Sequence, residues 1–432
     1  MRLFMRFPLY FCLLLSPLIV AEGGQANELA GYVDMAIAND QRIAQARARI
    51  TASEAGVSAA NAPRRPQVSV GGTYSWTEQR EPLELDYNNA EAALDLQQSL
   101  WQRNQLARRD LAKLQVEATG IEVARATRNL LGELSEAFFD LLNQRREIAV
   151  YRAQLNALDN ALQREESRFA AGVSSTPRLN AVRAEHAQVN ASLVMAEALL
   201  VTYQDVLVRL VGEEIDLPEA GKTPEFSLPA GDAHIWRDRA ARQNQDLRLA
   251  DNAIAQANQG ITLAQRGNDP SLNLFGRWAR ASNPNGMELV NEFQQVGVRL
   301  NVPLYTGGGV SASTTQAEQD YLAAQLARDY QADLLASSVR LRWRQLESQL
   351  AVIEANEVAL LSAEQSLELN QVAYSNNALG QQELLDAQSR FYVAERKLAA
   401  SRYDFSRRLI DLYALAGELD KARLLKVIGD WL

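Results

Sequence analysis

Four short segments of the chain alternate apolar and polar residues, which is the pattern of a β-strand whose two faces meet different surroundings. In the first of them, Val68, Val70, Tyr74 and Trp76 share one face and Ser69, Thr73 and Ser75 share the other. The four predicted strands are 67–77, 90–101, 271–280 and 294–305. Each has about ten residues, the length that a tilted strand of a transmembrane barrel needs.

The polar faces of these segments carry charges that a packed core would not accommodate well. We therefore expect the faces to line a water-filled lumen, with Asp95, Gln97, Asn273, Arg277, Arg299 and Asn301 as lumen residues. Phe275 is an exception, because it lies on the polar face of its strand. A half-buried sheet in a soluble sandwich is the alternative interpretation of the strands alone.

The chain between the strand pairs is predicted to form helices of unusual length. Apolar residues from Leu130 to Leu162 are spaced by alternating fours and threes, with Gln144 out of place, and a similar series runs from Val339 to Leu360. A period of 3.5 held over several heptads is typical of helices packed along a left-handed seam. Each arm would extend for roughly 100 Å at 1.5 Å per residue.

The arms reverse direction at two tips, about 171–177 and about 375–381. In the first tip, Gly172 suits the left-handed end of a helix, Thr176 suits an N-cap and Pro177 suits the first helical position. Each return helix together with an opening helix (35–62 or 236–266) is nearly as long as one arm. We therefore expect two short helices, stacked end to end, beside each long one.

This arrangement of strands and helices occurs twice along the chain, as an internal repeat. Pro66 matches Pro270 and Leu96 matches Leu300 at an offset of 204, and the pair Gly212-Glu213 matches Gly417-Glu418 after one inserted residue. The predicted organisation is a signal peptide (1–26), a first repeat (27–212), a linker (213–235), a second repeat (236–417) and a C-terminal tail (418–432). Four strands cannot close a barrel, since about eight are the minimum, so the chain is expected to oligomerise.

The N-terminus combines two arginines with an apolar run of about fifteen residues, which is typical of an export signal. The only cysteine, Cys12, lies inside that run, so no disulfide and no lipid anchor on cysteine is expected. No later stretch is expected to cross a membrane as a helix. The net charge of −9 makes nucleic acid an improbable partner.

The sequence offers little that resembles a catalytic or metal site. His186 and His234 are far apart and have no cysteine beside them, so we expect no metal and no cofactor. The run from Thr306 to Gly309 lacks the Lys-Ser/Thr of a nucleotide-binding loop and is better explained as a flexible strand-to-helix connection. An enzyme is therefore not expected. A periplasmic adaptor with a helical hairpin is the alternative to a channel, although its lipoyl-like β halves are not recognisable.

The order and spacing of these segments resemble the TolC-like outer-membrane channel proteins of Gram-negative export systems. The residues that carry the resemblance are PRRPQVSVGGTYSW, NDPSLNLFGRWA, VRLNVPLYTGGGV, RFAAGVSSTPRLNAVR and the region that begins with ELLDAQSRF after the second tip. The resemblance implies a homotrimer in the outer membrane whose twelve strands form one β-barrel, continuous with an α-helical barrel that crosses the periplasm. It also implies a periplasmic adaptor and an inner-membrane transporter as partners, and a belt around the tube formed by the linker and the tail.

A candidate gate lies at the second tip. Glu383 and Asp386 are three residues apart at a helix start, so they share one face, and a trimer would arrange them in two acidic rings that favour cations. Acids near a helix N-terminus that simply complement its dipole are the alternative. Relatives resemble this chain in carrying acids at these places and an aromatic at Tyr374. Where relatives can offer an acid on the facing turn this chain has Arg178, so an ion pair from Arg178 is the expected closed-state lock.

Overall fold

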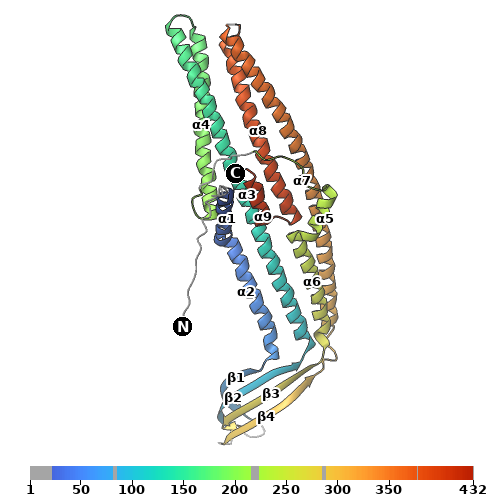
Figure 1. Ribbon diagram of the computed structural model, residues 1–432. Coiled ribbons are helices and arrows are strands. Elements are labelled where there is room, and N and C mark those ends of the chain that lie inside the picture. Colours follow the sequence, from blue (N-terminus) through green and yellow to red (C-terminus); the bar gives the residue numbers. More distant parts are fainter. Residues whose placement is uncertain (1–21, 81–84, 216–222, 285–288, 377, 432) are drawn as a thin grey trace, which may run out of the picture.

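The protein is described by a computed structural model that covers residues 22–80, 85–215, 223–284, 289–376 and 378–431. It is elongated, with one curved β-sheet at one end and two long helical hairpins at the other (Figure 1). The predicted signal peptide lies almost entirely outside the described residues. The mostly helical fold with a small sheet that the sequence predicts is confirmed.

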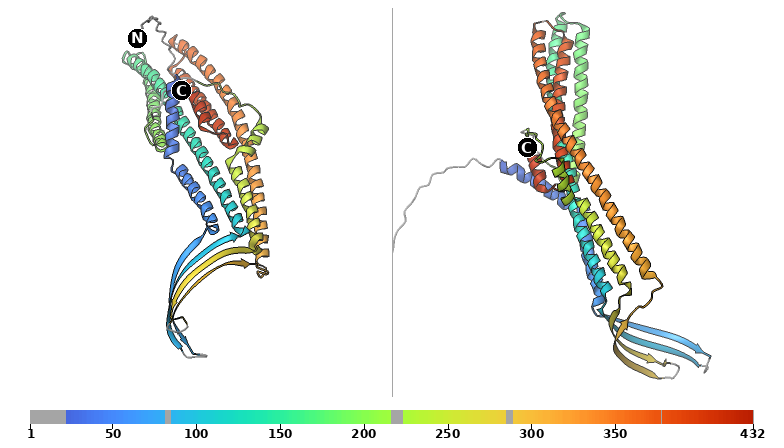
Figure 2. Two further views of the ribbon diagram at one scale, coloured as in Figure 1. Left: turned by 60° about the horizontal axis from the view of Figure 1, so that its bottom comes forward. Right: turned by 90° about the vertical axis from the view of Figure 1, so that its right-hand side faces the viewer.

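The sheet has four antiparallel strands in the order β1-β2-β3-β4. Their bounds are Gln67–Gln79 for β1, Leu85–Trp101 for β2, Ser271–Ser282 for β3 and Val290–Asn301 for β4. The prediction for the last strand was wrong at both ends, since β4 starts earlier and stops before Val302. Pro303 explains the end, because proline cannot donate a hydrogen bond to a neighbouring strand. Figure 2 shows the sheet as a curved blade that bends away from the helices.

Two very long helices, α3 (Arg103–Ala170) and α7 (Gly309–Ser375), leave the sheet and run to the two tips. The helices α4 (Thr176–Val211) and α8 (Gln381–Ala416) return from the tips to the middle of the molecule. There α2 (Gln41–Asn61) continues beside α3, and α6 (Gln245–Gln265) continues beside α7 (Figure 1). Short 3-10 turns, Ala62–Arg64 and Arg266–Asn268, connect α2 to β1 and α6 to β3.

The predicted seam along α3 is buried, including the polar residue that interrupts it. Gln144 is 3% exposed and donates a hydrogen bond from Nε2 to the carbonyl oxygen of Ala196 on α4, at 3.0 Å. A buried amide is tolerated when it is hydrogen-bonded. The apolar series of the second repeat, from Val339 to Leu360, is interrupted by Glu357, which stays exposed and accepts a hydrogen bond from Arg402 at 2.8 Å.

The opening helices were expected to be continuous, and that prediction was wrong. The first is divided into α1 (Glu22–Asn39) and α2 at Asp40, and the second into α5 (Ala233–Gln243) and α6 at Asn244. Asp40 and Asn244 are related by the repeat, and both are N-caps whose side chains accept from amides of the following helix. The side chain of Asn39 also donates to the carbonyl oxygen of Val211, as that of Asn244 does to Leu415. Each break is thus hydrogen-bonded to the C-terminal end of a return helix.

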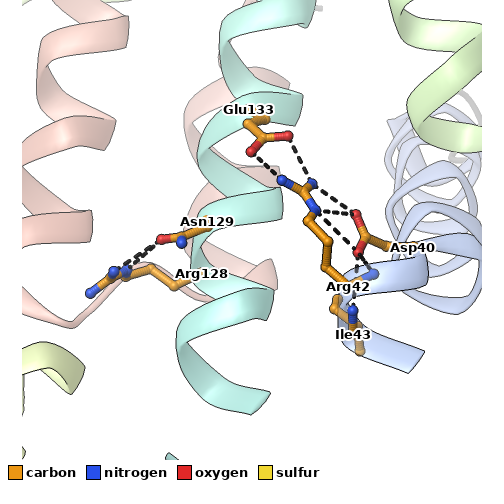
Figure 3. Close-up of polar contacts among 6 residues, drawn as sticks. All are labelled: Asp40, Arg42, Ile43, Arg128, Asn129 and Glu133. Carbon is orange, nitrogen blue, oxygen red and sulfur yellow. Dashed lines mark hydrogen bonds and ion pairs between the residues drawn. The ribbon is translucent and has the colours of Figure 1, made fainter. Parts of the chain in front are cut away.

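The first break is reinforced by charges, as Figure 3 shows. Arg42 lies between Asp40 and Glu133 of α3, with its Nη1 2.6 Å from Oε1 of Glu133. Partial burial would raise the pKa of Asp40, but hydrogen bonds from Arg42 and from the amide of Ile43 lower that pKa below its usual value. The network fixes the angle at which α2 leaves α1 and packs along α3.

The middle of the molecule holds the largest apolar core. Here α9 (Lys421–Gly429) and the residues after it fold back against α3 and α8. Trp431 is 4% exposed and stacks on Tyr403 with ring centroids 4.1 Å apart, and burial raises the pKa of Tyr403 to about 12. Trp431 also donates from Nε1 to Oγ of Ser406 at 3.0 Å. The C-terminal tail is therefore a packed part of the core.

One helix departs from the expectation that no later stretch could span a membrane. By length and composition α4 passes as a membrane span, with a window of mean hydropathy 1.4 of which 17% is buried. Its exposed apolar residues, which include Val194, Met195 and Val201, lie on a helix that packs against α3 on its other side. The apolar side of α4 that faces away from α3 is therefore left exposed by the described residues.

The left-handed glycines at the helix ends give a first prediction. Gly417 ends α8 with φ of 73°, and a Cβ at this position would lie 2.4 Å from the backbone oxygen of Gln243. Gly172 at the first tip has φ of 74° but open space around it. Gly172→Ala should therefore cost only the left-handed strain, about 1 kcal/mol, whereas Gly417→Ala should cost clearly more because backbone atoms must move. Denaturant unfolding of the two variants checks this, and equal losses would contradict it.

Candidate functional site: a charged sheet face and a helical tip

The register of the sheet aligns polar residues from all four strands. Asp95 of β2 lies opposite Ser69 of β1 and opposite Arg277 of β3, and Arg277 lies opposite Gln295 of β4. Because side chains of directly paired residues point to the same side of a sheet, these four residues share one face. Gln97 is on this face two residues from Asp95, and Asn273 and Arg299 form a directly opposed pair there.

Asn301 ends β4 opposite Ser271 and belongs to the same face. All six residues predicted to line a lumen therefore lie on one face of the sheet. Their role in a lumen stays a prediction.

Arg277 is the centre of an ion-pair cluster on this face. It contacts Oδ1 of Asp95 at 3.3 Å and forms a short ion pair with Glu91, both on β2. Sequence reasoning missed Glu91, although a period of two from Asp95 places it on the same face. Since β2 belongs to the first repeat and β3 to the second, this cluster joins the two repeats across the sheet.

The opposite face of the sheet is apolar over most of its length and is left uncovered by the described residues, while Arg280 and Glu292 lie on this face toward the hairpin ends. Val70 is 82% exposed and Val296 is 82% exposed, and Tyr74, Trp76, Val298 and Leu300 are exposed on the same side. Contiguous exposed apolar surface of this kind marks a contact with lipid or with another protein. One side of the sheet is thus suited to hydrocarbon and the other to water.

At the second tip, α8 presents two carboxylates on its free side. Leu384 and Leu385 are buried, and Leu385 packs with Leu158 and Val182 from the other hairpin. Glu383 and Asp386 flank this buried pair and are exposed. The carboxylate of Glu383 folds back over Gly380 at the helix start, and Asp386 accepts a hydrogen bond from Nε2 of Gln382 at 2.9 Å. Both acids point away from the packed side of α8.

The two expected gate partners lie near the tips as well. Tyr374 is half-buried in the last turn of α7, and Arg178 is exposed in the first turn of α4. In the part of the chain that the structure describes, neither forms a hydrogen bond or ion pair with Glu383 or Asp386. An Arg178 lock within one chain is therefore not formed here, and the lock stays a prediction about contacts between chains.

His186 has a local contact. It lies on α4 with Nε2 2.8 Å from Oδ1 of Asp159 on α3, and the ion pairs Arg152–Glu197 and Arg183–Glu166 also join the first hairpin. Among the described residues, no group of three His, Cys, Asp or Glu side chains could hold a metal ion. Gly307 and Gly308, in the connection from β4 to α7, have φ of 63° and 82°, which supports the conformational role expected for that loop.

A sheet with an apolar and a charged face, joined to helical hairpins of this length, is the architecture expected of an outer-membrane channel, and the family that the chain matches is one of channels rather than enzymes. The chain belongs to the outer membrane efflux protein family, whose sequence profile matches residues 32–213 and again 236–418. The adaptor alternative is not supported by any of these comparisons.

Relatives and solved structures agree with this family. The chain is 26% identical over 411 residues to outer membrane protein TolC of Vibrio cholerae serotype O1, covering 93% of each chain. It is 22% identical to the proteases secretion protein PrtF of Dickeya chrysanthemi, covering 96% of this chain and 94% of the relative. The open state of the Neisseria gonorrhoeae MtrE outer membrane channel has the same fold, with a TM-score of 0.76, 18% identity and coverage of 91% and 90%.

Proposed function

We propose that three copies of this chain form one outer-membrane channel, the exit duct of an export system that spans both membranes. The observation that carries the proposal is the open four-stranded sheet, whose outer strands β1 and β4 pair with no further strand among the described residues. Sheet edges do not occur in contact with lipid, so an apolar-faced sheet must close. Three sheets would give a barrel of twelve strands.

The helices support the same assembly. On α7 the exposed apolar residues Leu322, Leu326, Tyr330, Leu334 and Leu341 follow one another at helical spacing. Residues four apart on a helix lie on one face, so these side chains form a stripe that the described residues of the single chain leave exposed. Neighbouring chains would cover this stripe and the apolar side of α4, and the three pairs of hairpins would form a tube.

The family of the chain supports a proposal about the partners of the duct. We propose a periplasmic adaptor and an inner-membrane transporter at the tips, and outer-membrane lipid around the barrel. The passengers would be proteins or small molecules, since relatives include both a proteases secretion protein and an outer membrane efflux protein, BepC of Brucella suis. The linker and tail, which include the packed α9, would form a belt around the middle of the tube.

We place the periplasmic gate at Glu383 and Asp386, with Tyr374 and Arg178 as partners. In a trimer the two acids of each chain would bring six carboxylates into a narrow mouth. Their repulsion would be relieved by cations, by protonation or by Arg178 of a neighbouring chain. The exposed position of both acids beside buried Leu384 and Leu385 supports this assignment.

The gate assignment predicts a change in ion selectivity. Replacing Glu383 and Asp386 together by alanine should lower the preference of single channels for cations and weaken their block by multivalent cations in a planar bilayer. The pair Glu383→Gln and Asp386→Asn should have the same effect, because charge is what the pair removes. Gln382→Ala is the matched control, since it removes a hydrogen bond to Asp386 and keeps both charges.

Replacing Arg178 should change the conductance of the channel, whereas replacing the two acids should change its ion selectivity. Arg178→Ala leaves the acids in place but removes the proposed lock, so conductance should rise. If channels of the double alanine variant kept the parent's selectivity and cation block, the gate assignment would be wrong. Both acids would then only complement the dipole at the start of α8.

A further inference from the structure

The water-facing side of the sheet carries four charges among its described positions. Three of them, Glu91, Asp95 and Arg277, form the ion-pair cluster and leave a net charge of −1 in each chain. The fourth is Arg299, which forms no ion pair with any described carboxylate. Arg299 also lies closer to the helices than the ion-pair cluster does, because it is two residues from the end of β4 where the sheet meets the helices.

Arg299 is held by an aromatic ring instead of an acid. Its guanidinium carbon lies 4.9 Å from the centre of the Phe275 ring. Such a contact orients a guanidinium through the ring's quadrupole but leaves its net charge uncompensated. The cation therefore remains available to a passing anion.

The pairing of β3 with β4 explains why Phe275 interrupts the alternating pattern of its strand. Phe275 lies directly opposite Gly297 on β4, and a Cβ on Gly297 would lie 2.9 Å from the tip of the ring. The ring thus reaches across the neighbouring strand at the one position that has no side chain, two residues before Arg299. Phe275 and Gly297 together build a platform beneath the guanidinium.

We propose that Arg299, seated on Phe275, forms a ring of three guanidinium groups at the helix-facing end of the barrel lumen and attracts anionic groups, such as carboxylates, on passengers and ions. This inference rests on the proposed trimer. A guanidinium presents a planar fork of donors that matches a carboxylate. The channel would then have two selective regions in series: acidic rings at the tip that favour cations, and a basic ring in the barrel that favours anions.

The test compares single channels of Arg299→Gln and Arg280→Gln in a planar bilayer under a KCl gradient. Arg280 is on the same sheet but on its opposite face, paired in register with Glu292, so its replacement removes the same charge from outside the lumen. Arg299→Gln should raise the permeability ratio of K⁺ to Cl⁻ by about twofold or more in 0.1 M salt, with a smaller effect at 1 M, where the Debye length falls to about 3 Å. Arg280→Gln should match the parent.

Three further measurements sharpen the test. Arg299→Lys should keep the parent's selectivity because it keeps the charge, and Phe275→Leu should shift selectivity part of the way because the platform is lost. Citrate added to the bath, as a multivalent anion, should block the parent more strongly than Arg299→Gln.

The outcomes separate the inference from the channel itself. A parent protein that forms no channels would contradict the proposed function. Channels in which Arg299→Gln keeps the parent's selectivity and citrate block would overturn the inference about Arg299 and leave the proposed function standing.

Discussion

Replacing Val298 by lysine should prevent the protein from assembling in the outer membrane. Val298 is 57% exposed on the apolar face of β4, directly opposite Leu274. A lysine facing lipid costs up to about 2–4 kcal/mol, depending on its depth in the bilayer, and a symmetric trimer would carry that cost three times. The amount of folded protein in outer-membrane fractions should therefore fall close to zero.

The matched control is lysine at Gln97, on the other face of the same sheet. Gln97 is exposed and belongs to the row of polar residues that includes Asp95 two positions away. Gln97→Lys should assemble at the parent's level because water can solvate the new charge. If both variants assembled equally well, or failed equally, the two faces of the sheet would not meet lipid and water.

Replacing Trp431 by alanine should cause the largest loss of stability of any single change in the tail. The side chain contacts Tyr403, Phe139 and Phe226 in the central core. Truncating a buried tryptophan to alanine typically costs 3–5 kcal/mol. Denaturant unfolding of the detergent-solubilised protein should show a loss of that size, together with detachment of α9.

Trp431→Phe distinguishes packing from hydrogen bonding at this site. It keeps most of the ring contacts and removes the hydrogen bond to Ser406, so it should cost only about 1 kcal/mol. If the alanine variant were as stable as the phenylalanine variant, the packing of Trp431 in the core would contribute little to the free energy of unfolding.

The strand faces and the long helices could be predicted because each rests on a local period. A period of two assigns Asp95 and Arg277 to one side wherever the strands end, and a period of 3.5 identifies the seam of α3 even with Gln144 inside it. These features need no knowledge of distant residues. They account for the fold class and for which side of the sheet is charged.

The remaining features depend on contacts between residues far apart in the sequence. The breaks at Asp40 and Asn244 carry residues that favour N-caps, but the carbonyl groups of Val211 and Leu415 that fix their geometry lie more than 170 positions away. Phe275 violates the alternation for the same reason, since the space over Gly297 becomes visible only once β3 and β4 are paired. The partner of Arg178 is a further case, because it would belong to another chain.

The most direct test of the account is the mass of the protein extracted from outer membranes in mild detergent, measured by native mass spectrometry. Each chain has four strands and two open sheet edges among its described residues, so the account predicts a single species of three chains. A monomer or a dimer as the stable species would contradict it, because neither four nor eight strands of this open sheet would give the twelve-stranded duct on which the gate and the Arg299 ring depend.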